Sequence, residues 1–229
     1  MSNIQRDYTM QQATAFLFDL NGTMIDDMQY HIKAWHKILT ELGANLSLQQ
    51  MKEECYGKND ELLERIFPGR FSVEEKKRMS IEKETTYQKE YQPQLSLIKG
   101  LSSFLDSAYA NGIPMAIGSA AIMFNIDFVL DGLNIRPYFK SVVSADDVHY
   151  SKPHPETYLK CADQLNRSPE HCIVFEDAPK GVAAAENAGM QAVVITTMHT
   201  AEEFSQYKNI LCFVEDYSDQ QLNRFLSKM

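Results

Sequence analysis

The segment TAFLFDLNGT, residues 14–23, joins a short apolar run to a run of polar and small residues. The apolar part, Thr14 to Phe18, has the length and composition of a strand that is buried on both faces. Asp19, Asn21 and Thr23 follow directly where this strand should end. In parallel sheets, ligands bind beyond the carboxyl ends of such strands. The segment therefore predicts an α/β protein with a polar site next to Asp19.

The same alternation of buried strand and amphipathic helix continues through most of the 229 residues. Further strands are expected at 113–117, 141–143, 172–175 and 192–195, and helices at 100–111, 122–133, 155–165 and 179–188. Ser168, Pro169 and Glu170 have the cap and first-turn proline of another short helix. This alternation predicts a doubly wound parallel sheet.

One long block, residues 27–94, breaks this alternation with a strongly charged, helical pattern. Its apolar residues recur at helical intervals, as in Ile38, Leu42, Leu62, Leu63 and Ile66. A block of this length is too long for a loop. We therefore expect a small all-helical domain at 27–94, inserted into a core formed by residues 1–26 and 95–229. The alternative is a structural excursion without a function.

The composition argues against several kinds of partner. The 22 basic and 31 acidic residues give a formal net charge of −9. Without a long basic run, neither nucleic acid nor an anionic membrane surface is expected as a partner. Residues 1–12 are mostly polar, so we expect neither a signal peptide nor a membrane span. The four cysteines are far apart and lack metal-binding spacing, which favours a reducing cytoplasm.

Polar side chains follow four of the expected strands. Asp19 comes after the first strand, Ser119 after the second and Lys152 shortly after the third, while Glu176 and Asp177 follow the fourth. Together these residues supply a nucleophilic carboxylate, a hydroxyl donor, a fixed cation and an acidic pair. Those groups are what an enzyme needs to transfer a phosphoryl group with Mg²⁺.

Four motifs in this order, FLFDLNGT, AIGSA, SKPHPE and VFEDAPKGVAAAENAGM, resemble those of the haloacid dehalogenase superfamily of phosphatases and phosphomutases. The likeness is greatest to the β-phosphoglucomutase-like members, which insert a small helical cap where residues 27–94 lie. The resemblance covers nearly the whole chain. It implies a Rossmann-like core and a mobile helical cap over the carboxyl ends of the strands.

The resemblance also implies roles for single residues. Asp19 would be the nucleophile that takes the phosphoryl group as an aspartyl-phosphate. Ser119, with Ala120 beside it, would bind a phosphate oxygen, and Lys152 would neutralise charge on the phosphate and on Asp19. Taken alone, an Asp after a strand is often only a helix cap, and Ser119 or Lys152 could be a cap or a surface residue.

The same resemblance implies a magnesium site. Glu176 and Asp177 would hold Mg²⁺, with Asp177 as the direct ligand of the two, and Asp19 and the backbone carbonyl of Asn21 would complete the protein ligands. The alternative for the acidic pair is electrostatic, because it opens the helix expected at Pro179 and would interact favourably with the helix N-terminus.

Asn21 departs from the family pattern. Most phosphatases and mutases of the family carry Asp at this position, where it protonates the departing alcohol and then activates water or a second hydroxyl. An amide cannot exchange a proton in this way, and a positioned acid or base is worth about 10²–10⁴-fold in rate. Three explanations remain open: substrates with good leaving groups such as acyl phosphates or pyrophosphate, a proton from His31 or Asp26, or a protein that binds phosphometabolites with little turnover.

The cap is expected to set specificity. Lys58, Asn59 and Asp60 would approach the leaving group when the cap closes over the core. Asp60 stands where β-phosphoglucomutases carry an arginine for a second phosphate, and its charge would repel such an anion. Asp60 therefore argues against a mutase that uses a bisphosphate.

Two further cap residues match positions that face the substrate in the family. His31 lies in the expected first cap helix, and Lys83 lies near the family's cap lysine. The alternatives are structural. His31 and Trp35 are four residues apart and could pack on one helix face, and the run Glu82-Lys83-Glu84 favours a solvated lysine.

The sequence thus predicts a cytoplasmic, Mg²⁺-dependent phosphohydrolase that acts on a small phosphorylated metabolite as a monomer or weak homodimer. One alternative is a hexose-phosphate mutase of the β-phosphoglucomutase type. The other is a catalytically impaired protein that binds phosphometabolites.

Overall fold

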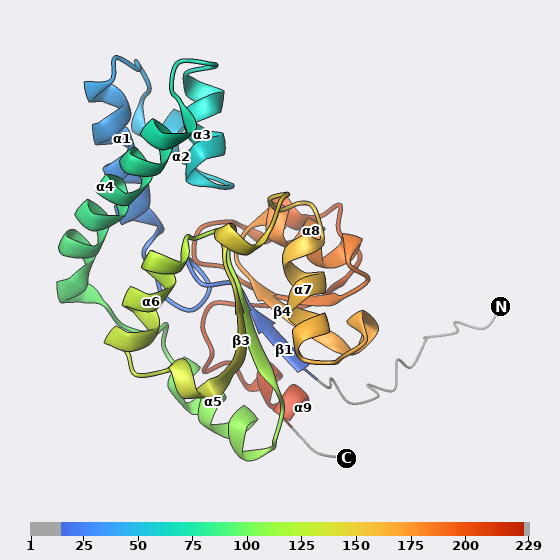
Figure 1. Cartoon of the computed structure of the whole chain (residues 1–229). Helices are drawn as coiled ribbons and strands as arrows, with labels where there is room; N and C mark the ends of the chain where they lie inside the picture. The colour runs from blue at the N-terminus through green and yellow to red at the C-terminus, as the bar shows by residue number, and fades with distance from the viewer. Residues whose placement is uncertain (1–14, 227–229) are drawn as a thin grey trace.

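The structure is a computed structural model, and it describes residues 15–226 of the chain. It consists of an α/β core with a block of helices at one end of its sheet (Figure 1). The described core contains a parallel six-stranded sheet in the order β3-β2-β1-β4-β5-β6. This confirms the expected doubly wound α/β fold. The expected strand start at Thr14 and the polar residues 1–12 lie outside the described residues.

The elements have the following bounds. The strands are β1 (Ala15–Phe18), β2 (Met115–Gly118), β3 (Phe139–Val143), β4 (Cys172–Glu176), β5 (Gln191–Ile195) and β6 (Ile210–Val214). The α-helices are α1 (Met28–Glu41), α2 (Leu48–Glu54), α3 (Asn59–Ile66), α4 (Val73–Tyr91), α5 (Leu101–Ala110), α6 (Met123–Gly132), α7 (Glu156–Gln164), α8 (Pro179–Asn187) and α9 (Asn223–Leu226).

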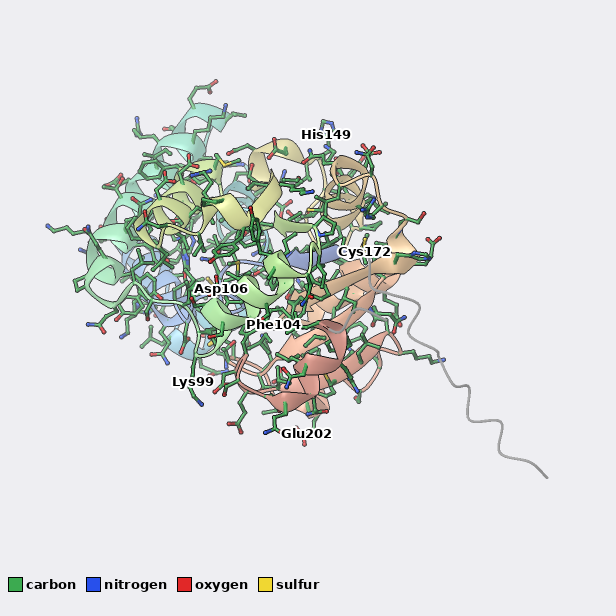
Figure 2. All side chains as sticks on the ribbon, turned by 90° about the horizontal axis from the view of Figure 1, so that it is seen from below. Lys99, Phe104, Asp106, His149, Cys172 and Glu202 are labelled. Carbon is green, nitrogen blue, oxygen red and sulfur yellow. The ribbon has the colours of Figure 1, made fainter. Side chains whose placement is uncertain are left out.

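The central strand β1 is buried on both faces, as its apolar sequence predicts. Phe16 and Phe18 belong to the hydrophobic cluster under α5 and α6, whereas Leu17 belongs to the cluster under α7 and α8. On the first face, Phe104 of α5 stacks on Phe16 with ring centroids 5.6 Å apart. Figure 2 shows Phe104 inside the core, whereas Lys99 just before α5 points into solvent. The two-residue period of β1 therefore divides the core into two layers.

Two details differ from the expected elements. The edge strand β6 was not predicted, although its residues, ILCFV, are all apolar. The short helix expected at Ser168 is a single 3-10 turn, Pro169–His171, and Ser168 makes no side-chain cap bond. Because β4 begins at Cys172, the chain has no room for a further helical turn.

The helical block has a hydrophobic cluster of its own. Its buried members are Ile32, Trp35, Leu39, Met51, Leu62, Leu63 and Met79. Its longest helix, α4, starts with a capping box in which the Ser72 hydroxyl accepts from the Glu75 N–H and the Glu75 carboxylate accepts from the Ser72 N–H. At its far end α4 brings Tyr87 and Tyr91 into the cluster shared with the core. The domain limits 27–94 stay a prediction.

None of the helices described between residues 15 and 226 is long and apolar enough to span a membrane.

Phe104 provides a test of the packing between α5 and the sheet. The change Phe104→Ala should lower the free energy of unfolding by about 3–5 kcal/mol, because it removes a buried ring and leaves a cavity. Phe124 on α6 is 43% exposed and is the matched control. Phe124→Ala should change stability by less than about 0.5 kcal/mol. Urea unfolding measures both, and equal losses in the two variants would contradict this packing.

Candidate active site

Polar residues from three neighbouring strands meet at the carboxyl edge of the sheet. Strand β1 pairs with β2 on one side and with β4 on the other. Asp19 follows β1, and its N–H donates to the Phe175 carbonyl of β4 at 3.0 Å. Ser119 follows β2, and Glu176 is the last residue of β4. Because the strand order changes direction around β1, this edge is where a doubly wound sheet binds ligands.

Three carboxylates form a cluster there. One oxygen each from Asp19, Glu176 and Asp177 lies within 4.8 Å of the others, and all three residues are buried. Glu176 is already saturated, since Oε1 accepts from Lys152 Nζ (2.7 Å) and Tyr158 Oη (2.8 Å), while Oε2 accepts two backbone N–H groups. Asp177 Oδ1 accepts from the Thr23 hydroxyl at 3.1 Å. Asp19 and Asp177 are therefore better placed than Glu176 to contact a cation.

Two glycines make room for the cluster. A Cβ at Gly22 would lie 2.1 Å from Asp177 Oδ2, and a Cβ at Gly181 would lie 1.7 Å from Glu176 Oε1. Gly22 also has a φ of +76°, a conformation that favours glycine. Glycines at these two positions let the backbone approach the carboxylates closely.

The charges of the cluster do not balance. Among the described residues, the ammonium bonded directly to it is that of Lys152, which lies 2.6 Å from Asp19 Oδ1. Burial, together with the charges of Glu176 and Asp19, raises the pKa of Asp177 well above its ordinary value. Burial also raises the pKa of Asp19, although the charge of Lys152 opposes the shift. Hard oxygen donors with excess negative charge are a set that fits Mg²⁺.

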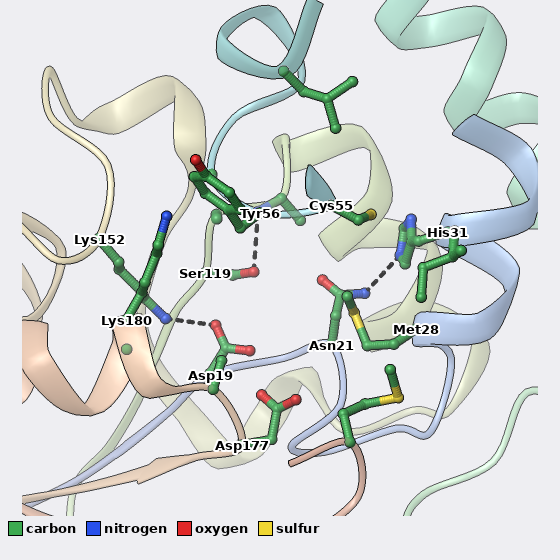
Figure 3. Close-up of a pocket in the computed structure, with 18 of the residues that line it drawn as sticks. Asp19, Asn21, Met28, His31, Cys55, Tyr56, Ser119, Lys152, Asp177 and Lys180 are labelled. Carbon is green, nitrogen blue, oxygen red and sulfur yellow. Dashed lines mark hydrogen bonds and ion pairs between the residues drawn. The ribbon is translucent and has the colours of Figure 1, made fainter. Parts of the chain in front are cut away.

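Donor groups lie beside this cluster. Ser119 is buried, and its Oγ accepts from the Ala121 N–H at 3.1 Å, which leaves the hydroxyl hydrogen able to donate to a ligand. Ser119, Ala120 and Lys152 all line the same cavity as Asp19 (Figure 3). The four expected motif positions therefore converge on one site, with donors on one side and carboxylates on the other.

Asn21 is fixed by a residue that the sequence analysis did not single out. Its Nδ2 donates to Asp27 Oδ2 at 2.6 Å and lies 3.0 Å from His31 Nε2. The same Asp27 oxygen accepts from the Tyr87 hydroxyl, and Asp27 is fully buried. Burial would raise the pKa of Asp27, but the charge and hydrogen bond of His31, with the bonds from Tyr87 and Asn21, hold it below its ordinary value.

His31 and Lys83 form one buried network with Glu84. Lys83 Nζ lies 2.5 Å from His31 Nδ1 and donates to Glu84 Oε1 at 2.9 Å. Lys83 is only 2% exposed, so the expectation of a solvated lysine in this charged run is wrong. His31 and Trp35 are both buried, as expected if they pack on one helix face, and both also line the cavity. Asn59 completes the network with a bond from Nδ2 to Glu84 Oε1 at 2.9 Å.

The start of α3 contacts the core directly. Lys58 Nζ donates to the Val148 carbonyl at 2.5 Å, and the Ser151 hydroxyl donates to Glu61 Oε1 at 2.8 Å. Lys58 and Asn59 line the cavity as expected. Asp60 is exposed on the outer side of this turn and is not among the described residues that line the cavity. The contacts hold the helical block against the loop that carries Lys152.

The cavity itself lies between the core and the helical block and has a volume of about 320 Å³. Asp19 and Asp177 lie at its core end, and Asn21 and His31 lie toward α1 (Figure 3). Its wall on the helical side includes the apolar residues Met28, Ile32, Trp35 and Leu62. The same wall also carries Lys52, Lys58 and Lys83. The cavity therefore has carboxylates and Lys152 at its core end, and a mixed apolar and basic wall against the helices.

Sequence reasoning missed Asp27 and Tyr87, and it also missed Tyr158, whose hydroxyl donates to Glu176. Asp27 precedes His31 by four residues and Tyr87 follows Lys83 by four, spacings that place each pair on one helix face. This four-residue spacing is the sequence feature that could have identified Asp27 and Tyr87 as neighbours of His31 and Lys83. Asp26, the sequence candidate next to Asp27, is exposed and is not among the described cavity residues.

The chain is similar in sequence and fold to several known proteins. The model of the haloacid dehalogenase-like hydrolases matches residues 16–195. Fructose-1-phosphate phosphatase YqaB of Escherichia coli is 29% identical over 194 residues, covering 80% of this chain and 96% of that protein.

Two solved structures have the same fold. A haloacid dehalogenase hydrolase of family IA from Entamoeba histolytica is 27% identical with a TM-score of 0.82, covering 93% of this chain and 97% of that one. A β-phosphoglucomutase from Clostridium difficile is 28% identical with a TM-score of 0.80, covering 93% and 96%.

The repulsion within the carboxylate cluster can be measured in EDTA. At pH 8, Asp177→Asn should raise the melting temperature, by about 2–4 °C for each kcal/mol of repulsion removed. The gain should shrink as the pH falls toward the ordinary aspartate pKa of about 3.9, because the Asp177 carboxyl then becomes protonated in the unfolded chain as well as in the folded protein, where its pKa is raised. Asp163→Asn, at an exposed position of α7, is the control and should show no gain. A lower melting temperature for Asp177→Asn at pH 8 would contradict the charge imbalance.

Proposed function

Because the chain belongs to the haloacid dehalogenase-like hydrolases and is an enzyme of the phosphatase or phosphotransferase type, we propose that it is a Mg²⁺-dependent phosphatase. Its substrate is a small phosphorylated metabolite, and it releases inorganic phosphate. The observation that carries the proposal is the environment of Asp19. Lys152 binds Asp19 Oδ1, while Oδ2 points away from that ammonium (Figure 3).

The first half of the reaction uses Asp19 as the nucleophile. An oxygen of its carboxylate forms a bond to phosphorus, and the bond from phosphorus to the leaving oxygen breaks. Lys152 orients Asp19 through Oδ1, and the Ser119 hydroxyl donates to an oxygen of the transferring group. In-line displacement directs the leaving group away from Asp19, toward the helical side of the cavity.

The second half returns the enzyme to its starting state. A water oxygen bonds to phosphorus, and the bond between phosphorus and the Asp19 oxygen breaks, which releases phosphate and the free carboxylate. When bound at Asp19, Asp177 and the Asn21 carbonyl, Mg²⁺ supplies positive charge that stabilises the charge on phosphate oxygens. Lys152 stabilises the departing Asp19 carboxylate, because its ammonium already bonds to that group. The contacts of Lys58 and Glu61 with the core support closure of the cavity during these steps.

A hexose-phosphate mutase is less well supported. Such an enzyme needs cations on the cap side for a second phosphate. Three lysines of the helical block line the cavity, and each has a protein partner. Lys83 is bound to Glu84 and His31, Lys58 to the Val148 carbonyl and Lys52 to the Met198 carbonyl. A protein that only binds phosphometabolites has no need of a nucleophile, yet Asp19 is present with its Lys152 partner. The cytoplasmic location and the monomeric or weakly dimeric state stay predictions.

Phosphate release tests the proposal. With Mg²⁺, the protein should release inorganic phosphate from at least one of acetyl phosphate, pyrophosphate and a panel of sugar phosphates. Asp19→Asn should abolish release, and EDTA should do so reversibly, whereas the control Asp163→Asn should stay active. Release by Asp19→Asn at the parent rate would contradict the role of Asp19, and an isomerised sugar phosphate in place of phosphate would indicate the mutase.

Metal binding has a readout that is independent of turnover. Mg²⁺ should raise the melting temperature of the parent protein, because a ligand that binds only the folded state stabilises it. The effect should be lost in Asp177→Asn and kept in Asp163→Asn. Equal shifts in the parent and in Asp177→Asn would place the metal elsewhere.

A further inference from the structure

The leaving-group side of the cavity holds a carboxamide. Asn21 lies in the wall between Asp19 and helix α1, on the path that a leaving group takes away from Asp19 (Figure 3). An amide oxygen accepts hydrogen bonds and carries no proton. A proton for the leaving oxygen must therefore come from a neighbouring group. The orientation of the Asn21 amide also decides which of its atoms faces that oxygen.

Asp27 determines the orientation of Asn21. Its carboxylate accepts from Asn21 Nδ2 at 2.6 Å, from the Tyr87 hydroxyl, and, through Oδ1, from the Gly22 N–H at 3.3 Å. A carboxylate with these donors around it is an acceptor only, so the amide must turn its NH₂ toward Asp27. Turning the amide over would bring its carbonyl oxygen against the carboxylate. Asn21 Oδ1 therefore faces the cavity on the side of Asp19, as Figure 3 shows.

His31 is not placed to supply the proton that Asn21 lacks. Its Nε2 is 3.1 Å from Asp27 Oδ2 and 3.0 Å from Asn21 Nδ2, and its Nδ1 is 2.5 Å from Lys83 Nζ. The ring is also stacked on Tyr87, with centroids 3.9 Å apart. Both ring nitrogens face protein groups, and the stacking keeps the ring from turning toward the cavity.

Three more lysines of the described lining already have partners: Lys58 donates to the Val148 carbonyl, Lys52 donates to the Met198 carbonyl, and the Lys180 ammonium lies over the Tyr56 ring, 2.8 Å from its centroid. The other titratable groups of this lining are also engaged or exposed. Glu84 Oε1 accepts from Lys83 and Asn59. His199 bonds to Glu203, and Glu53 is exposed. Burial raises the pKa of the Cys55 thiol to about 11, so it is a weak acid. Among the described residues, none of these groups is placed beside Asn21 so that it could protonate the leaving oxygen.

From this arrangement we propose that the substrate is an acyl phosphate, whose leaving group departs as a carboxylate without being protonated; this rests on the phosphatase function proposed above. An Asp19 oxygen bonds to phosphorus, the bond from phosphorus to the acyl oxygen breaks, and the electron pair stays on the carboxylate. Water then attacks phosphorus, the bond to Asp19 breaks, and the proton from water ends on the phosphate. Asn21 Oδ1 accepts a hydrogen bond from that water and orients it.

The chemistry of the leaving group separates two substrate classes. A carboxylate leaving group has a conjugate-acid pKa of about 4, whereas the pKa of the alcohol that a sugar phosphate releases is far higher. A sugar alkoxide therefore needs a proton as it departs, and a carboxylate does not. The helical wall combines Met28, Ile32 and Trp35 with three lysines. These lysines are already bonded to protein groups, Lys52 and Lys58 to backbone carbonyls and Lys83 to Glu84, so the wall suits the organic part of an acyl phosphate better than the second charged group of pyrophosphate.

The leaving-group dependence of the parent protein is the test. We would measure kcat/KM with Mg²⁺ for acetyl phosphate, pyrophosphate, phenyl phosphate and fructose 1-phosphate. Acetyl phosphate should exceed fructose 1-phosphate by at least about 10²-fold, the usual worth of a positioned acid. Equal values for these two, or a higher value for pyrophosphate, would overturn the acyl phosphate assignment. A folded parent that releases phosphate from none of the compounds would instead overturn the phosphatase function itself.

A variant that exchanges the amide and the carboxylate tests whether the missing acid at Asn21 causes this substrate preference. Asn21→Asp combined with Asp27→Asn keeps a carboxylate paired with an amide but moves the acid into the cavity. It should shift the kcat/KM ratio of fructose 1-phosphate to acetyl phosphate upward by about 10²–10⁴-fold. Asp27→Asn alone alters the same pair without adding a cavity acid, so this control should not shift the ratio toward fructose 1-phosphate. An unshifted ratio in a folded exchange variant would overturn the proposal; if that variant fails to fold, the parent leaving-group series still decides.

Discussion

The bond network of Lys152 is the interaction on which the arrangement of the carboxylates depends. Its ammonium bonds to Asp19 at the end of β1 and to Glu176 at the end of β4, so it joins two adjacent strands at the carboxyl edge of the sheet. Without that cation, the buried carboxylates of Asp19 and Glu176 would face each other with no positive charge between them. Lys152 offsets only part of the charge, because Asp177 adds a third buried carboxylate. The excess is what makes the site suited to a divalent cation and an anionic substrate.

A second network, centred on Asp27, controls the chemistry on the opposite side of the cavity. Asp27 binds Asn21, His31 and Tyr87 at once, and Lys83 closes the network from α4. The carboxylate of Asp27 and both ring nitrogens of His31 have protein partners, and these bonds hold the side chains in place. The two networks divide the cavity into an end with the carboxylates and Lys152, which we propose binds the phosphate, and an end where Asn21 accepts hydrogen bonds. This division connects the unusual Asn21 with a narrower class of leaving group.

Much of the fold follows from the sequence because the central strands are short apolar runs. The position of the motifs follows as well, since parallel strands must end at one edge of the sheet. The buried network around Asp27 was harder to predict from the sequence. Its contact between His31 and Lys83 joins residues 52 positions apart, and it forms only because α1 packs on α4. The charged run around Lys83 indicated solvent, and only that tertiary contact shows why the lysine is buried. Asp60 illustrates the same limit, because the phase of α3 turns Asn59 inward and leaves Asp60 exposed.

The most direct test of this account is to trap the phosphorylated protein. The protein would be quenched in acid during turnover of acetyl phosphate, digested, and examined by mass spectrometry for an added phosphoryl group. The account predicts an acid-stable, base-labile phosphoryl group on the peptide that contains Asp19, and none in Asp19→Asn. A phosphoryl group on another residue, or steady phosphate release with no labelled Asp19 at any quench time, would contradict it.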